Sequence, residues 1–267
     1  DMTGRFLRDL CLAATCVFSF LSIGPAVAAD HGDLGVVVLH GKWDSPNGNA
    51  SGLANYLTRE GFRVSKPEMP WSGSRGYDQG ADAVVAEISK AASKLTAAGA
   101  KKIFVVGHSQ GAIGSLHYAS QQQVDGIALI AVGGHPQAKA YQAHYASVVT
   151  EAKGLVAQGK GGEKLRFEDL NTGGRKRSIK SPARSVLDYF DPEGPFNSEL
   201  SAARIKPGTR VLIVIPRNEI QALKGAAKKI AKSLPAEIRA HMVEVDADHL
   251  HAPDAAKAAV RDWLLAL

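Results

Sequence analysis

The chain has 267 residues, of which 45% are hydrophobic and 22% are charged, with 27 glycines and 12 prolines. This balance is that of a globular protein, and it excludes a disordered, collagen-like or coiled-coil chain. The formal net charge is only +6, and the one concentrated basic run, at residues 175–184, contains no aromatic side chain that could stack on bases. We therefore expect that run to be a solvated surface, and we expect no nucleic-acid partner.

The first 29 residues have the composition of a secretory signal. Two arginines precede an apolar stretch at residues 10–23, and small residues follow up to Ala28 and Ala29. This pattern predicts export to the periplasm or the medium, with cleavage after one of these alanines. The apolar stretch is shorter than the ~20 residues of a membrane-spanning helix, so we expect no membrane anchor after cleavage. A retained anchor and a lipoprotein attached through Cys16 are the alternatives.

From residue 35 onward, short apolar segments alternate with segments of helical periodicity. Strands are expected over residues 35–40, 62–66, 102–107, 127–132, 210–215 and 239–245. Helices are expected over residues 49–60, 77–98, 110–122, 141–158, 220–233 and 254–266. Such alternation predicts an α/β fold with a mostly parallel sheet and helices on both faces. The alternation breaks between residues 134 and 206, which predicts a cap insertion within one domain spanning 30–267.

The segment Gly107 to Gly111 reads Gly-His-Ser-Gln-Gly, follows an apolar strand and opens a helix. A serine on such a turn projects its hydroxyl above the end of the sheet, and the glycines avoid collisions within the bend. This motif in this setting resembles the nucleophile turn of the α/β-hydrolase superfamily, and the resemblance extends from about Gly35 to the C-terminus. It implies an α/β-hydrolase fold that lacks the first strands, with Ser109 as the nucleophile.

A serine hydroxyl needs a base within hydrogen-bond reach, and that base needs an acidic partner. The resemblance implies the chain order serine, acid, histidine, each on a loop after a strand. His249 follows the last predicted strand and occupies the position of the base, with the nearby His251 as the alternative. The carboxylates and imidazoles of residues 246–251 could also suggest a metal. The sequence offers no partner cluster elsewhere, so we expect neither a metal nor a cofactor.

The acid follows the predicted strand at residues 210–215. Similar enzymes carry a Gly-x-x-Asp pattern there, whereas this chain reads Pro216-Arg217-Asn218-Glu219. Glu219 thus falls on the position of the acid, and a small backbone shift can absorb its additional methylene. Alternatively, Glu219 only opens the next helix, where the dipole favours an acidic residue. Asp191 is then the next candidate.

An oxyanion hole requires hydrogen-bond donors aimed at the developing charge. One expected donor is the backbone N–H of Gln110, the residue after the nucleophile. The pair His40-Gly41 resembles the oxyanion loop of the family, which implies the backbone N–H of Lys42 as the second donor. His40 and His108 are expected to have structural roles.

Aromatic side chains follow the strands that lead to this site. Trp43 and Trp71 lie after the first and second predicted strands, where ligands bind in open α/β sheets. We therefore predict that they line the substrate site, with packing beneath the insertion as the alternative. Aromatic residues of the insertion are expected to roof the pocket, namely Tyr141, Tyr145, Tyr189 and Phe190.

The resemblance implies a serine hydrolase that cleaves small-molecule or polymeric carboxylic esters through an acyl-enzyme. Peptidase, thioesterase or lactonase activity is an alternative chemistry for the same residues. A non-catalytic ligand-binding protein on the same fold is the alternative from a different class, because a fold alone does not establish an activity.

Overall fold

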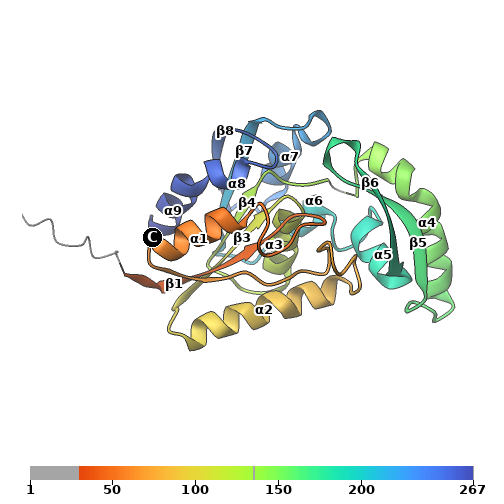
Figure 1. Cartoon of the computed structure of the whole chain (residues 1–267), viewed down its shortest axis with the longest axis horizontal. Coiled ribbons are helices and arrows are strands. Elements are labelled where there is room, and N and C mark those ends of the chain that lie inside the picture. Colours follow the sequence, from red (N-terminus) through yellow and green to blue (C-terminus); the bar gives the residue numbers. More distant parts are fainter. Residues whose placement is uncertain (1–29, 135, 267) are drawn as a thin grey trace, which may run out of the picture.

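A parallel six-stranded sheet forms the centre of the molecule (Figure 1). The computed structural model describes residues 30–134 and 136–266, so the predicted signal segment lies outside the described residues. All neighbouring strands pair in parallel, in the order β2-β1-β3-β4-β7-β8. The strands are β1 (His31–Leu39), β2 (Phe62–Ser65), β3 (Lys102–His108), β4 (Gly126–Ile130), β7 (Arg210–Asn218) and β8 (Ala240–Asp248).

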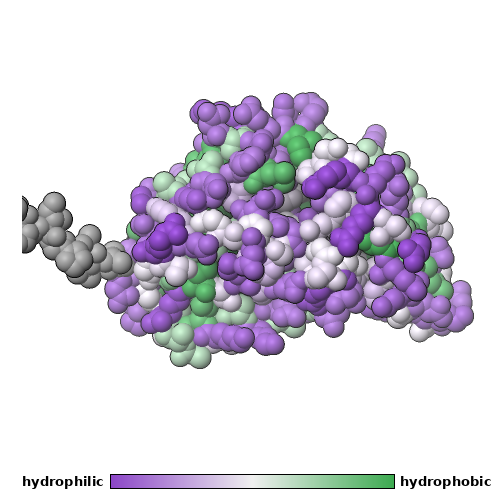
Figure 2. Space-filling view, viewed as in Figure 1, coloured by the Kyte–Doolittle hydropathy of each residue, from purple (hydrophilic) through white to green (hydrophobic). Residues whose placement is uncertain are grey.

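Helices cover both faces of this sheet, which confirms the α/β prediction (Figure 1). One face packs against α1 (Ser51–Arg59), α8 (Ala252–Ala255) and α9 (Lys257–Leu265), and the other against α2 (Ala81–Ala97), α3 (Gln110–Gln121) and α7 (Ala226–Ser233). Alternate residues of β1 enter opposite cores, Val36 and Val38 on one side and Val37 and Leu39 on the other. This two-sided burial explains why the strands read as continuous apolar runs. Hydrophilic residues cover most of the face that Figure 2 shows.

The segment between β4 and β7 contains more regular structure than the sequence predicts. It comprises α4 (Lys139–Ala157), β5 (Lys164–Leu170), a 3-10 turn η1 (Thr172–Gly174), β6 (Lys176–Pro182), α5 (Ala183–Phe190) and α6 (Ser198–Ala202). Strands β5 and β6 form an antiparallel hairpin that packs with α4 and α5 at one end of the molecule (Figure 1). We call α4, β5, β6 and α5 the cap. Only the helix at 141–158 was expected here, whereas the hairpin, α5 and α6 were not.

Two helices have other bounds than the sequence predicts, and the backbone conformation explains both differences. The helix expected from residue 77 begins at Ala81, because Tyr77 has the left-handed φ of 61° and Gly80 has an extended backbone with ψ −162°. The helix expected over 220–233 is broken into a 3-10 turn, η2 (Gln221–Leu223), and α7. Gly225, with φ 88°, separates the two.

Within the described residues, no helix combines the length and apolar character needed to cross a membrane.

The strand order reverses its direction between the neighbouring strands β1 and β3. The chain leaves β1 toward β2 on one side, and it leaves β3 toward β4 on the other side. The loops that follow β1 and β3 therefore diverge at the carboxyl ends of these strands, which is where open α/β sheets bind ligands.

Candidate active site

Ser109 lies on a strained turn between β3 and α3. Its backbone has φ 55° and ψ −114°, and its N–H donates to Ile130 O of the neighbouring strand at 3.0 Å. Backbone of this kind persists only where its surroundings enforce it. A Cβ on Gly107 would collide with the Gly111 carbonyl, and one on Gly111 would collide with Leu39 O. The two glycines thus permit the tight strand–helix approach that raises the Ser109 side chain above the sheet.

Glu219 and His249 approach each other because two strands end side by side. Asn218 of β7 pairs with Asp248 of β8, and the register shifts by a bulge just after Pro216. Proline has no N–H to give to the ladder, and bulges change the direction of the side chains that follow. Glu219 directly follows β7, and His249 directly follows β8. His249 Nδ1 lies 2.8 Å from Glu219 Oε1, and both side chains are buried.

The imidazole of His249 bridges the carboxylate and the serine. Its Nε2 lies 2.9 Å from Ser109 Oγ. Because a carboxylate only accepts hydrogen bonds, Nδ1 donates to Glu219, and this leaves Nε2 to accept from the serine hydroxyl. Glu219 Oε1 also accepts from Ile220 N–H at 2.7 Å, which fixes the carboxylate. This arrangement can withdraw the proton from the Ser109 hydroxyl when an electrophile approaches.

The two alternative residues from the sequence have other partners. Asp191 pairs with Lys153 Nζ at 2.8 Å. His251 is exposed, and its Nδ1 lies 2.8 Å from Asp248 Oδ1. Among residues 30–134 and 136–266, no group of three or more His, Cys, Asp or Glu side chains is arranged to hold a metal ion.

Two backbone N–H groups border Ser109. Gln110 opens α3, so its N–H lies at the positive end of that helix. The loop that carries Lys42 passes over the serine, since a Cβ on Gly41 would lie 3.4 Å from Ser109 Cβ. Lys42, Ser109 and Gln110 line a common cavity. Within the described parts of the chain, no hydrogen bond engages the N–H of Lys42 or of Gln110, so both are available as oxyanion donors.

Two buried histidines hold the loops of the site in place. His40 Nε2 accepts from Met69 N–H at 3.1 Å, and its Nδ1 donates to Gly41 O at 2.9 Å. His108 Nε2 lies 2.8 Å from the backbone oxygen of His249. Burial lowers the pKa of His108 to about 4, with a further contribution from His249. The ring is therefore neutral at pH 7, and Nε2–H donates to His249 O.

Asp169 of the cap is a residue that the sequence reasoning missed. Its wholly buried carboxylate accepts hydrogen bonds from Lys42 Nζ (2.9 Å), Tyr145 Oη (2.5 Å), Trp43 Nε1 (2.7 Å) and Tyr77 Oη (3.1 Å). Burial by itself lowers the pKa of Lys42, but the adjacent Asp169 carboxylate and the Tyr141 hydroxyl together outweigh burial and raise it, so Lys42 remains protonated. Trp43 and Tyr77 both have left-handed backbones, with φ 58° and 61°. Asp169 thus ties the cap to two strained loops, one of which carries the Lys42 N–H.

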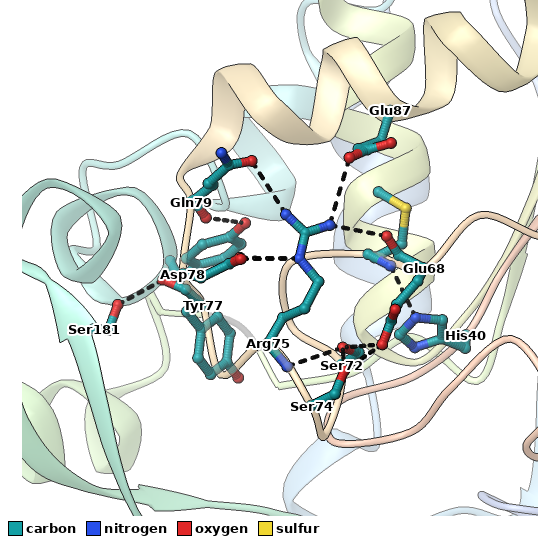
Figure 3. A network of polar contacts seen from close by, with 12 residues as sticks. His40, Glu68, Ser72, Ser74, Arg75, Tyr77, Asp78, Gln79, Glu87 and Ser181 are labelled. Carbon is teal, nitrogen blue, oxygen red and sulfur yellow. Dashed lines mark hydrogen bonds and ion pairs between the residues drawn. The ribbon is translucent and has the colours of Figure 1, made fainter.

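The second of these loops, residues 66–80, has its own polar network (Figure 3). Arg75 bonds to Asp78 and Gln79 and to the backbone oxygen of Glu68, and it pairs with Glu87 at 3.5 Å. The Glu68 carboxylate also accepts from Ser72 and Ser74, while Ser181 of β6 donates to Tyr77 O at 2.8 Å. The network therefore fixes the segment between Met69, which holds His40, and Tyr77, which holds Asp169.

The two tryptophans predicted to bind substrate have different surroundings. Trp43 lines a cavity beside Ser109 and donates to Asp169. Trp71 is wholly buried, donates to His40 O at 2.9 Å and packs against Phe196. The prediction that Trp71 lines the substrate site is therefore wrong, because its ring is part of the core beneath the cap. Among the cap aromatics, Tyr141 lines the cavity next to Ser109, while Tyr145, Tyr189 and Phe190 are buried in the cap core.

The molecule combines a parallel α/β sheet, a serine on a strand–helix turn and a neighbouring histidine–carboxylate pair. These features together define the α/β-hydrolase class. A model of the alpha/beta hydrolase family matches residues 36–263, so the chain belongs to this family. No curated protein matches the chain.

Solved structures of the same fold include two hydrolases. A siderophore hydrolase, EstB from Aspergillus fumigatus, superposes with a TM-score of 0.63 at 13% identity, covering 88% of this chain and 90% of its own. A monoacylglycerol lipase from Paleococcus ferrophilus gives 0.60 at 18% identity, with 86% and 93% covered. At these identities the likeness shows the shared fold.

Proposed function

We propose that the protein is a serine hydrolase that cleaves carboxylic esters through an acyl-enzyme. The observation that carries the proposal is the continuous chain of hydrogen bonds from Glu219 through His249 to Ser109. The family membership and the esterase and lipase names among the structural neighbours support the same reaction class.

In the first half of the reaction, Ser109 Oγ attacks the ester carbonyl while His249 Nε2 takes its proton. Glu219 stabilises the imidazolium that forms. The N–H groups of Gln110 and Lys42 bind the oxyanion of the tetrahedral intermediate. His249 then gives the proton to the departing alkoxide oxygen, so an alcohol leaves and the acyl group stays on Ser109.

In the second half, His249 removes a proton from water, which attacks the acyl carbonyl. The intermediate collapses with return of the proton to Ser109 Oγ, and the carboxylic acid leaves. These groups complete the cycle without a cofactor. Gly133 leaves room for the reacting carbonyl, since a Cβ there would lie 3.0 Å from Ser109 Oγ and from Gln110 N.

Hydrolysis of matched butyryl substrates tests this proposal. An ester, an anilide, a thioester and a lactone of similar size are compared, and the ester is expected to give the highest kcat/KM. Ser109→Ala should abolish turnover while the circular dichroism spectrum stays unchanged. A well-folded wild-type protein without turnover of any of the four would contradict the proposal and favour a ligand-binding role.

Export belongs to the same proposal and is supported by the composition of residues 1–29. Expression of the full chain in a bacterial host should yield an extracytoplasmic protein whose N-terminal sequence begins near Asp30. Recovery of the protein with residues 1–29 still attached would contradict export with cleavage.

A further inference from the structure

Two cavities of different character meet at Ser109. The first, of about 230 Å³, is lined by Gln110 and by a group of apolar side chains that includes Tyr141, Leu170, Ile220 and Leu223. The second, of about 140 Å³, is lined by His249 and by polar side chains that include Asp44, Asn49, Thr172 and Arg175. We call them the apolar cavity and the polar cavity. Lys42, Ser109, Asn171 and Thr172 line both.

The position of His249 decides which part of an ester enters which cavity. His249 must hand a proton to the leaving oxygen, so the alcohol part of the substrate must lie on the side of its Nε2. His249 forms part of the wall of the polar cavity. The acyl part then extends the other way from Ser109, into the apolar cavity, where Gln110 supplies one of the oxyanion donors.

His108 lies at the wall of the polar cavity, but its unpartnered nitrogen is closed to a ligand. His108 Nδ1 has no hydrogen-bond partner among the described residues, and the side chain is nearly inaccessible. Because Nε2–H donates to His249 O, Nδ1 of the neutral ring can only accept. It faces Gly41, on which a Cβ would lie 3.4 Å from the nitrogen. Because Gly41 covers this buried nitrogen, a hydroxyl in the cavity does not reach it, and the polarity of the cavity comes from its other side chains.

Charged groups at the same wall favour a neutral ligand over a charged one. Arg175 Nε donates to Thr172 O, which keeps its guanidinium at the wall. Asp44 lies at the same wall, and its carboxylate accepts from the N–H groups of Ser45 and Asn49. A cation and an anion together offer both donors and acceptors to hydroxyl groups without selecting one sign of charge.

We propose that the site selects esters that join an apolar acyl group to a small alcohol bearing further hydroxyls. This inference rests on the proposed function and specifies its substrate class. A cavity of about 140 Å³ is several times the space that one water needs, so a three-carbon polyol fits. The hydroxyls of such an alcohol would exchange hydrogen bonds with Asn49, Thr172 and Arg175, which an alkyl alcohol cannot do.

A pair of butyrate esters of similar size tests the alcohol side. The ratio of kcat/KM for 2,3-dihydroxypropyl butyrate to kcat/KM for butyl butyrate is measured first. It is then divided by the ratio of the rates at which hydroxide hydrolyses the same two esters, which removes the greater intrinsic reactivity of the polyol ester. We call the result the corrected preference. We expect a corrected preference of about tenfold or more for the dihydroxy ester. A preference near one, or for the butyl ester, would overturn the inference.

Two asparagines of one loop supply a matched pair of variants. Both are exposed, but Asn49 lines the polar cavity, whereas Asn47 lies outside its wall and accepts from Lys66 Nζ at 3.3 Å. Asn49→Leu should lower the corrected preference by about threefold or more, and Asn47→Leu should leave it unchanged. Equal preferences in the two variants would overturn the assignment of the alcohol to the polar cavity.

The acyl side is tested with an exposed alanine of η2 that lines the apolar cavity, Ala222. Ala222→Trp should lower the kcat/KM for p-nitrophenyl octanoate by about tenfold relative to the acetate, because the indole occupies space that a longer acyl chain needs. Ala98→Trp at the exposed end of α2 is the control and should change neither value. An unchanged chain-length preference in Ala222→Trp would overturn the assignment of the acyl group to the apolar cavity.

Failure of this inference is distinguishable from failure of the proposed function. Absence of p-nitrophenyl butyrate hydrolysis by the folded protein would refute the function itself, and with it the inference. Hydrolysis of that ester without a corrected preference for the dihydroxy alcohol would refute the substrate class and leave the function intact.

Discussion

Replacement of Asp169 by asparagine removes the negative charge of the ion pair that holds the cap to the loop after β1. Each carboxylate oxygen accepts from two donors, Lys42 and Tyr145 on Oδ1 and Trp43 and Tyr77 on Oδ2. Whichever oxygen becomes an amide NH2, two of these donors lose their acceptor. Lys42 also becomes a buried cation without a counter-charge, because its side chain is only 8% exposed.

The cost follows from that burial. Removal of one partner from a buried ion pair destabilises a protein by about 3–5 kcal/mol, which is a large part of a typical folding free energy. With a urea dependence of about 2–3 kcal/mol per molar, the midpoint of urea unfolding should fall by roughly 1–2 M. The kcat for ester hydrolysis should fall as well, because the loop that presents the Lys42 N–H loses its anchor.

Urea titrations followed by tryptophan fluorescence measure this effect. The double variant Asp169→Asn, Lys42→Met removes both charges, so it should be less destabilised than the sum of the two single variants. A loss below about 1 kcal/mol in Asp169→Asn, or strictly additive single effects, would refute the structural role given to this carboxylate.

Three further predictions concern the catalytic acid, the catalytic base and one buried histidine outside the site. Glu219→Gln should lower kcat by roughly 10²–10⁴-fold, whereas Asp191→Asn should keep a near-wild-type rate; the reverse order would move the acid to Asp191. His249→Ala should lower p-nitrophenyl butyrate turnover by several orders of magnitude, and His251→Ala, at an exposed pair, should not; equal losses would contradict the assignment of the base. Burial lowers the pKa of His117 from 6.5 to about 4. Between these pH values the imidazole is therefore protonated in the unfolded chain and neutral in the folded protein. Stability should therefore fall as the pH drops from 6.5 toward 4, and His117→Gln should flatten that slope in urea titrations; an unchanged slope would contradict it.

The sequence could predict the parts of the site that depend on local signals. The apolar strand, the glycines and the following helix surround Ser109 within a dozen residues, and the turn has the expected strand–helix form. His249 likewise lies directly after β8, the strand that precedes the last helices. The parallel sheet follows from strand–helix alternation, because buried parallel strands need apolar residues on both faces.

Contacts between distant segments could not be predicted in the same way. The approach of Glu219 to His249 depends on the pairing of Asn218 with Asp248, and both strands extend past their expected ends. No local sequence pattern predicts the register between β7 and β8. The burial of Trp71 depends on the packing of Phe196 and the rest of the segment after β4.

The sequence of the β5–β6 hairpin carries a strand signal of its own. Leu165, Phe167 and Asp169 alternate with charged residues, and the glycines of η1 follow as a turn. A carboxylate at an inward position of such a strand requires buried partners. The sequence thus indicated that Asp169 has partners, but it could not indicate Lys42, which lies 127 residues away.

The site of covalent modification tests the central claim most directly. The protein is incubated with a fluorophosphonate, and the intact mass and the modified peptide are determined by mass spectrometry. The account predicts a single adduct on Ser109, formed much more slowly in His249→Ala. A folded protein that remains unlabelled, or an adduct on another residue, would contradict it.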